Sequence, residues 1–260
     1  MNNQSGSSIL QVEGLTVSYG SFHAVRNVSF DVKAGEIFGF LGPNGAGKTS
    51  TLSAVEGLLK PQSGTITVAG FDTAKKPLYA KANVGVQLQA TSFQPELTLA
   101  EIIQLYAGIY CVDLTKQKLQ NILQDIKLEE SATKKFKELS GGQQQRVSLV
   151  IATIHDPVLV LMDEPTTGLD PQARRQLWER IEAMRDKGHG ILLTTHSMEE
   201  AEAVCDRIAI MDHGNVITID TPQAIIDTHR NDPNVISVSR KGKITLEDVF
   251  IGLTGRTVRT

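Results

Sequence analysis

Cysteine and long apolar runs are both scarce in this chain of 260 residues. Its two cysteines, Cys111 and Cys205, form no CxxC pair. We therefore expect neither a disulfide framework nor a zinc site. We expect the protein to work in a reducing compartment. The strongest apolar run, Val158 to Met162, is far too short to cross a bilayer. The N-terminal stretch "MNNQSGSSIL" has no basic segment before an apolar core, so we expect no signal peptide.

An excess of positive charge is missing as well. Lysine plus arginine number 26 against 29 aspartates plus glutamates, which gives a net charge of -3. This balance lacks the electrostatic footprint of a nucleic-acid-binding protein, so we expect no nucleic-acid partner. We interpret the run Lys134, Lys135 and Lys137 as a solvated helix face. Hydrophobic residues make up 40% of the chain, which is enough for the core of one large domain or two small ones.

Short strands and helical patterns alternate along most of the chain. Fully apolar strands are predicted at 158–162 and 191–195, with helices from Ser140 and around 173–184. Further strands are predicted at 9–19, 25–32, 36–41, 65–70 and 84–89. The alternation of apolar strands with helices predicts an α/β fold whose parallel sheet is covered by helices on both faces.

Two segments depart from this alternation. Residues 97–137 carry two apolar stripes at helical spacing, which we interpret as a helical insertion. These stripes are Leu99, Ile102, Ile103 and Tyr106, then Leu119, Ile122, Leu123 and Ile126. Residues 207–219 predict a hairpin that turns at 212–215, and 221–245 look less regular. A short helix is expected to close the chain, with Leu246, Val249, Phe250 and Leu253 on one face.

The stretch "GPNGAGKT" predicts a phosphate-binding loop, because it fits G-x-x-x-x-G-K-[ST] between a predicted strand and a predicted helix. Glycines let successive backbone N–H groups point at a polyphosphate, and the helix N-terminus adds partial positive charge. Lys48 supplies a full charge for the β- and γ-phosphates, and the Thr49 hydroxyl is a candidate ligand for Mg²⁺. The candidate nucleotide-binding residues here are Gly42, Pro43, Asn44, Gly45, Ala46, Gly47, Lys48, Thr49 and Ser50.

Two other strands end in polar residues that point to chemistry. The strand at 158–162 delivers Asp163 and Glu164 to the sheet edge where the phosphate loop also lies. We assign Asp163 to Mg²⁺ and Glu164 to polarising an attacking water; alone, the pair would be a solvated strand end. His196 follows the strand at 191–195 and is placed to hydrogen-bond a γ-phosphate and that water.

The stretch "LSGGQ" has two readings. Ser140 with Gln143 three residues later is a capping-box pattern, so the stretch could be a helix start alone. However, Gly141 and Gly142 are poor helix formers in a first turn. A helix start that exposes bare N–H groups beside a serine hydroxyl is an anion site. Because the chain already has a phosphate loop, a second such surface implies a second molecule.

Four stretches in this order resemble the ATP-binding cassette (ABC) family of ATPases: "GPNGAGKT", "LSGGQQQR", "VLVLMDEPTTGLD" and "LLTTH". The resemblance covers essentially the whole chain, and "LSGGQ" is its discriminating motif. In that family two cassettes pair head to tail, and each ATP lies between one phosphate loop and the partner's LSGGQ helix. The signature residues would then be Leu139, Ser140, Gly141, Gly142 and Gln143.

The same resemblance assigns further residues by position. Tyr19 matches the aromatic that stacks on adenine, although it could instead be a strand aromatic packed in the sheet. Gln89 matches the glutamine that senses Mg²⁺ and the attacking water, with Gln87 as its rival. Asp170 matches the loop that crosses the dimer interface.

The resemblance implies a P-loop NTPase (RecA-like) core with an N-terminal antiparallel β subdomain and an inserted α-helical subdomain. The nucleotide-binding domain would span 1–222, with the helical subdomain at about 97–155 docked on a transmembrane permease. A short C-terminal extension would occupy 223–260. The chain would work with ATP and Mg²⁺, beside a second ABC subunit, as a peripheral protein on the cytoplasmic face of the cell membrane.

Several stretches are similar to exporters of the daunorubicin-resistance kind, most specifically the closing "LEDVFIGLTGR". The accessory segment usual before that stretch is mostly missing, since only 223–245 remain. Export of drugs, antibiotics, peptides or lipids is therefore an expectation from resemblance. The alternatives are a soluble ABC ATPase acting on ribosomes, a chromosome or repair ATPase, and a non-hydrolysing regulator. The chain lacks a second motif set and a long heptad coiled coil, and it keeps Glu164 and His196, which argues against each in turn.

Overall fold

The computed structural model describes residues 8–87, 93–239 and 243–255. Its centre is a six-stranded sheet in the order β10-β9-β3-β8-β7-β6. These strands are β3 (Ile37–Leu41), β6 (Val84–Gln87), β7 (Leu159–Asp163), β8 (Gly190–Thr195), β9 (Arg207–Asp212) and β10 (Asn215–Asp220). All neighbours are parallel except β9 and β10, which form the expected hairpin. The predicted parallel sheet is therefore confirmed, with one antiparallel edge.

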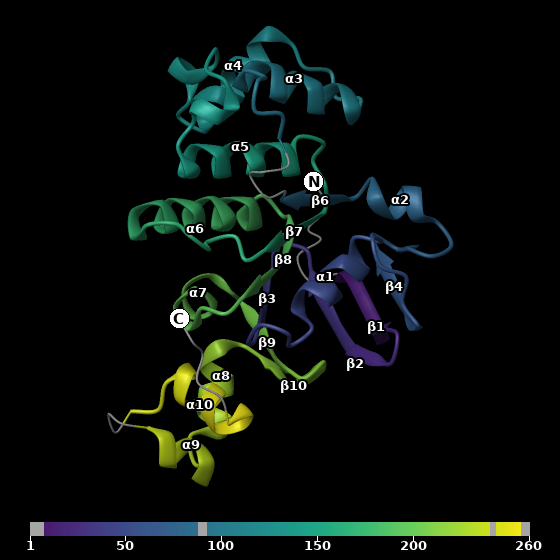
Figure 1. Cartoon of the computed structure of the whole chain (residues 1–260), viewed down its shortest axis with the longest axis vertical. Coiled ribbons are helices and arrows are strands. Elements are labelled where there is room, and N and C mark those ends of the chain that lie inside the picture. Colours follow the sequence, from purple (N-terminus) through teal and green to yellow (C-terminus); the bar gives the residue numbers. More distant parts are fainter. Residues whose placement is uncertain (1–7, 88–92, 240–242, 256–260) are drawn as a thin grey trace.

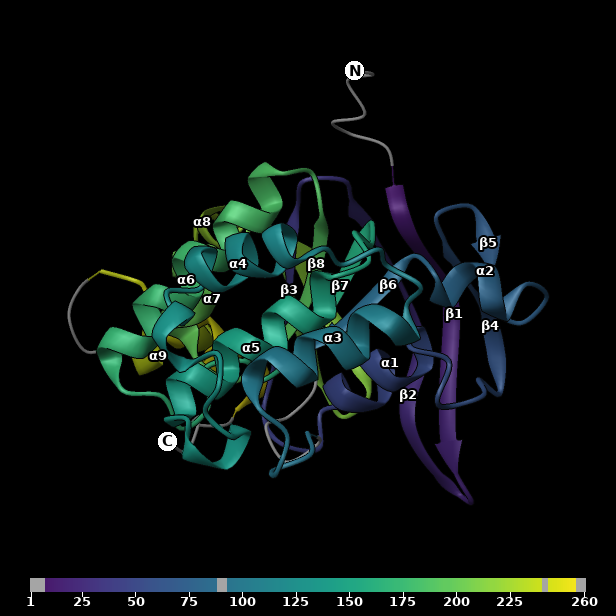
Figure 2. The same cartoon turned by 90° about the horizontal axis from the view of Figure 1, so that it is seen from above.

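A second, antiparallel sheet is built from the N-terminal part of the chain in the order β2-β1-β4-β5. Its strands are β1 (Ser8–Tyr19), β2 (Phe22–Lys33), β4 (Ser63–Val68) and β5 (Phe71–Asp72). Figure 2 shows it on the opposite side of the molecule from most of the helices. This arrangement confirms a P-loop NTPase fold with an N-terminal antiparallel β subdomain.

The two faces of the central sheet are covered differently. Side chains alternate along β7, so Leu159 and Leu161 pack in the core shared with the antiparallel sheet and α1 (Lys48–Val55), whereas Val160 and Met162 face the other helices. Helices therefore lie on both faces of the central sheet as predicted, but on the α1 side the antiparallel sheet packs there as well. The strands at 9–19 and 25–32 were foreseen, but their packing against the central sheet depends on contacts distant in sequence.

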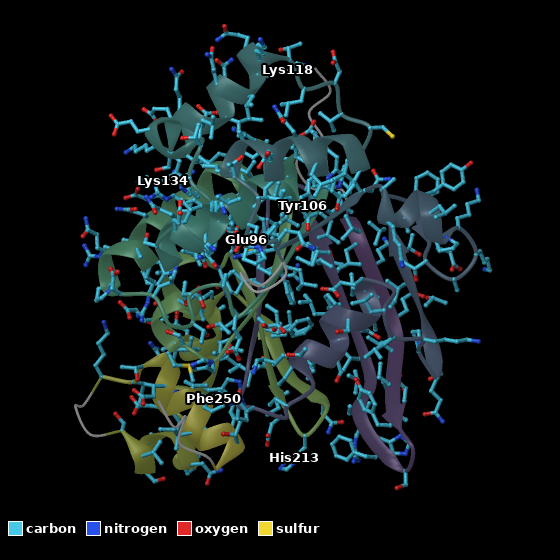
Figure 3. The ribbon with its side chains drawn as sticks, turned by 45° about the horizontal axis from the view of Figure 1, so that its top comes forward. Glu96, Tyr106, Lys118, Lys134, His213 and Phe250 are labelled. Carbon is cyan, nitrogen blue, oxygen red and sulfur yellow. The ribbon has the colours of Figure 1, made fainter. Side chains whose placement is uncertain are left out.

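The predicted helical insertion is confirmed and has its own core, around Leu99, Ile103, Leu123 and Val147. It contains α3 (Leu99–Ile109), α4 (Lys116–Asp125), the 3-10 turns Glu129–Ser131 and Phe136–Glu138, and then α5 (Gly141–Thr153). Figure 1 shows it standing above the rest of the molecule. The lysine run before α5 is not one helix face: Lys135 and Lys137 both bond to Glu96, which is labelled in Figure 3.

Helices flank the remaining strands. They are α2 (Pro77–Lys81), α6 (Pro171–Asp186), α7 (Met198–Val204), α8 (Pro222–His229), α9 (Pro233–Val238) and α10 (Leu246–Thr254). The irregular structure expected at 221–245 is wrong for the described residues, because α8 and α9 lie there. Each begins with a side-chain cap followed by proline at the first helical position, Thr221 before Pro222 and Asp232 before Pro233.

The C-terminal helices belong to the same core as the central sheet. Ile225, Val235 and Phe250 are buried in one cluster with Ile208 and Ile210 of β9. Phe250 is labelled on α10 in Figure 3. The closing helix predicted from its apolar face is confirmed over Leu246–Thr254.

Candidate nucleotide-binding site

The phosphate loop connects β3 to α1, and the space around two of its glycines, Gly42 and Gly47, leaves no room for a side chain. Gly47 has φ 106°, a conformation that favours glycine, and a Cβ there would lie 2.5 Å from the Ala24 carbonyl oxygen. A Cβ on Gly42 would clash with the carbonyl oxygen of Met211. The Ala46 carbonyl also accepts the N–H of Gly214 at 2.9 Å. The β9–β10 hairpin therefore holds the loop from behind.

Lys48 opens α1 and lies almost completely buried beneath the loop. Its Nζ donates to the carbonyl oxygens of Gly42 at 2.8 Å and Pro43 at 3.1 Å, and lies 3.9 Å from Glu164 Oε1. Burial lowers the pKa of the Lys48 ammonium below its usual range, and the carboxylates of Glu164 and Asp163 partly offset this. The loop thus places one cation where it can contact phosphate oxygens.

Tyr19 is half exposed at the end of β1, beside the start of α1. Its hydroxyl lies 3.4 Å from Ser50 Oγ, which places it next to the helix that follows the phosphate loop. An exposed ring in this place is free to stack on a base. The alternative, a ring packed inside the sheet, is not what the structure shows.

Asp163 ends β7 directly opposite Thr194 of β8. Its Oδ1 accepts hydrogen bonds from the Thr49 hydroxyl at 3.3 Å and from the Thr194 hydroxyl. Thr49 and Asp163 are thus brought together at the carboxyl edge of the sheet, as the sequence predicted. Their oxygens are the hard donors that Mg²⁺ prefers.

Glu164 turns away from the strand at φ 46°, a left-handed conformation that is uncommon outside glycine. Its backbone N–H donates to the Thr194 carbonyl at 3.2 Å and hydroxyl at 3.0 Å. The carboxylate accepts a 3.1 Å hydrogen bond from Thr167 and lies 3.3 Å from His196 Nδ1, although that pair is not aligned as a hydrogen bond. Glu164 and His196, predicted separately, therefore meet at this edge.

The glutamine assignment stays open. Gln89 lies outside the described residues. Its rival Gln87 ends β6 and is nearly buried, and its side-chain Oε1 has no hydrogen-bond partner among the described residues. The choice of Gln89 remains a prediction.

The signature residues begin α5 as the capping box predicted. Ser140 Oγ accepts the Gln143 N–H at 3.3 Å, and Gln143 Oε1 accepts the Ser140 N–H at 2.8 Å. Gly141 is exposed, and a Cβ there would meet nothing within 4 Å. Leu139 is buried in the core of the helical insertion.

A groove of roughly 410 Å³ lies beside these residues and is shared with the loop before α6. Asp170 lines it and caps α6, because its carboxylate accepts the N–H groups of Gln172 at 2.9 Å and Ala173 at 2.8 Å. None of the hydrogen bonds recorded within 8–87, 93–239 and 243–255 joins residues 139–143 to the phosphate loop. The groove beside the signature residues has no lining residue from the phosphate loop at 42–50.

Residues 25–167, more than half of the chain, match the family model described as ABC transporter. The chain belongs to the ABC transporter family. It is an ATP-binding subunit of that family and an ATPase.

Curated relatives and a solved structure agree with this assignment. The Nod factor export ATP-binding protein I of Ralstonia nicotianae is 40% identical over 233 residues, which cover 88% of this chain and 72% of that protein. The linearmycin resistance ATP-binding protein LnrL of Bacillus subtilis is 39% identical, over 82% of this chain and 69% of its own length. A solved ATP-binding subunit of an ABC transporter superposes with a TM-score of 0.81 at 30% identity, over 95% of this chain and 99% of that one.

No helix in the described part of the chain is long and apolar enough to span a bilayer. Membership of the family as an ATP-binding subunit implies a transmembrane partner and dimerisation.

Sequence reasoning missed two site residues, Thr194 and Thr167. Both contact Glu164, and Thr194 also contacts Asp163. Hydroxyl residues next to motif residues were visible in "PTTG" and "LTTH". Nothing in a single sequence told which of these hydroxyls faces the acidic pair.

Proposed function

We propose that this chain binds MgATP between its own phosphate loop and the signature helix of a second ABC subunit, and that it powers an exporter. The observation that carries the proposal is the meeting of Lys48, Thr49, Asp163, Glu164 and His196 at one sheet edge. Three segments that are separate in the sequence supply these groups, the start of α1 and the ends of β7 and β8, so their convergence is a property of the fold.

The residues divide into phosphate binders and hydrolytic groups. Lys48 and the N–H groups of the loop bind the β- and γ-phosphates, and Tyr19 stacks on the adenine. Thr49 and Asp163 would hold Mg²⁺, whose preference for hydroxyl, carboxylate and phosphate oxygens fits this pair. When bound, the ion would neutralise charge on the transferring phosphate. Gln89 is proposed to contact the ion and the attacking water.

Glu164 takes the role of general base. Thr167 fixes one carboxylate oxygen, and His196 stands beside the other, so the carboxylate is oriented before the water arrives. His196 is also placed to hydrogen-bond the γ-phosphate. Ser140, Gly141 and Gly142 would contact the γ-phosphate held by the partner subunit, and Asp170 would line the same interface.

The relatives support the proposed direction of transport. Relatives named for Nod factor export and for linearmycin resistance support a role in export, and the proposed cargo is a drug, an antibiotic, a peptide or a lipid. The helical subdomain would dock on the permease, and α3 ends in the exposed side chains Leu105, Ile109 and Tyr110, which suit such a contact. The subunit would lie peripherally on the cytoplasmic face of the membrane. Nothing in the comparisons supports a ribosomal role.

Glu164→Gln tests the assignment of the base. The amide has nearly the shape of the carboxylate but cannot accept the proton, so we expect kcat for ATP hydrolysis to fall by about 10²- to 10⁴-fold. ATP binding should remain, and an ATP-bound dimer should accumulate on size-exclusion chromatography. The exposed Glu202→Gln is the matched control and should behave as wild type. Normal turnover of Glu164→Gln would place the base elsewhere.

A further inference from the structure

Thr194 lies at the centre of the six-stranded sheet and is fully buried. Its strand, β8, pairs with β3 on one side, where Phe40 is its partner, and with β7 on the other, where Asp163 is its partner. A valine would have the same shape and the same preference for a strand. The feature that needs explanation is therefore the hydroxyl, since an unused polar group in such a place is costly.

That hydroxyl both donates and accepts a hydrogen bond. It donates to Asp163 Oδ1, the oxygen that also accepts from Thr49. It accepts the backbone N–H of Glu164 at 3.0 Å. A hydroxyl has one proton to donate and two lone pairs to accept with, so a single group serves two successive residues of the acidic pair.

The two bonds act on different parts of the site. The bond to Asp163 limits rotation of a carboxylate that faces Thr49 across 3.3 Å. The bond to the Glu164 N–H supports the backbone where it leaves the strand at φ 46°. Backbone in that region persists only when its surroundings hold it there.

We propose that Thr194 is a positioning residue that aims the Asp163 carboxylate at the divalent cation bound with ATP. The inference rests on the proposed function, in which Asp163 holds that cation. The inference extends the proposed function by naming a buried hydroxyl that sets how strongly the cation and the nucleotide bind together. The second bond, to the Glu164 N–H, makes the same hydroxyl a support for the base.

The test measures cation–nucleotide coupling at equilibrium, separately from hydrolysis. A fluorescent, non-hydrolysable ATP analogue is titrated into the full chain with saturating Mg²⁺ and with EDTA, and the ratio of the two dissociation constants is the coupling. Losing an oriented partner of a metal ligand costs about 10- to 100-fold in metal affinity. We expect Thr194→Val to lower the ratio by about tenfold or more, while affinity in EDTA stays unchanged.

Conservative variants separate positioning from packing. Thr194→Ser keeps the hydroxyl and should keep a coupling ratio near wild type, whereas Thr194→Ala should lose it. Thr194→Ser and Thr194→Ala differ by one oxygen, so their comparison tests the role of the hydroxyl even if Thr194→Val folds poorly. Thr153→Val is the matched control, because within the described part of the chain its hydroxyl bonds to carbonyl oxygens of its own helix, those of Leu149 and Val150.

The outcomes distinguish this inference from the proposed function. A wild-type ratio in Thr194→Val, or equal loss in Thr194→Ser and Thr194→Ala, overturns the positioning role. Asp163→Asn is measured beside them. If Asp163→Asn keeps the wild-type ratio, the cation is not held by Asp163, and the proposed function fails together with this inference.

Discussion

Glu56 ends the helix of the phosphate loop and carries an unusual carboxyl group. Burial raises the pKa of Glu56 from 4.5 to about 7, and the nearby charge of Asp163 adds to the effect. Among the described residues no lysine or arginine forms an ion pair with it. We expect Glu56→Gln, which removes the titration and keeps the shape, to stabilise the protein at alkaline pH.

The sign follows from proton linkage. The unfolded chain releases the Glu56 proton near pH 4.5 and the folded chain near pH 7, so the folded state binds more protons between these values. The free energy of unfolding of the wild type therefore falls as pH rises through this window and stays lower above it. Glu56→Gln should lack this fall.

The size of this change in the free energy of unfolding depends on the pKa shift of Glu56 and on how exposed its carboxyl group is. One pKa unit corresponds to about 1.4 kcal/mol. Glu56 is only partly buried, and solvent screening reduces the effect. We expect the stability of Glu56→Gln relative to wild type to rise by about 1 to 2 kcal/mol between pH 5 and pH 8.

Urea unfolding at several pH values measures this directly, with midpoints and slopes fitted for each protein. Glu202→Gln, at an exposed position of α7, is the control and should follow the wild type at every pH. A difference between Glu56→Gln and wild type that stays constant from pH 5 to pH 8 would refute the argument. It would mean that the carboxyl titrates alike in the folded and unfolded chains.

Two further predictions concern the partner site and the C-terminal helices. Ser140→Ala and Glu164→Gln are each expected to be nearly inactive alone. When the two proteins are mixed and exchange subunits in a symmetric dimer, ATPase activity should recover to at most about a quarter of wild type. If exchange is confirmed and an ATPase assay shows no recovery, the sites do not both span two subunits and act independently. Phe250→Ala should lower the free energy of unfolding by about 3 to 5 kcal/mol in a single transition, because Phe250 is fully buried in the core that contains β9. Ile236→Ala, at a position 54% exposed, should cost less than about 1 kcal/mol in the same denaturant titration, and a separate early transition in Phe250→Ala would show instead that 223–260 unfolds independently.

Local chemistry made the phosphate loop and the acidic pair predictable. Gly47 has a left-handed backbone and Lys48 begins the helix, so residues that are adjacent in the sequence set the local geometry of the loop. Asp163 could be placed because an apolar strand delivers its last residue to the sheet edge. The closing helix was also visible, since Leu246, Val249 and Phe250 share one face.

Long-range packing was not predictable in the same way. The covering of one sheet face by β1 and β2 depends on contacts between segments distant in sequence, and strand patterns do not say what a strand packs against. The role of Thr194 depends on the register of β7 with β8, which one sequence does not state. The helices in 222–238 have local signals, Thr221 and Asp232 each before proline, but with 8 and 6 residues they are too short to show a clear apolar stripe.

The first residues of α5 can cap the helix and also bind an anion. In a capping box the serine oxygen uses the N–H of the third helical residue, here Gln143, and the glutamine returns a bond to Ser140. The first two helical residues, Gly141 and Gly142, have no partner four residues earlier inside the helix, so their N–H groups are left over. Gly141 is exposed and has open space where a Cβ would be. The cap therefore fixes the helix start and still leaves the N–H groups of its first two residues without a helical partner, which is what binding a phosphate from a second subunit would require.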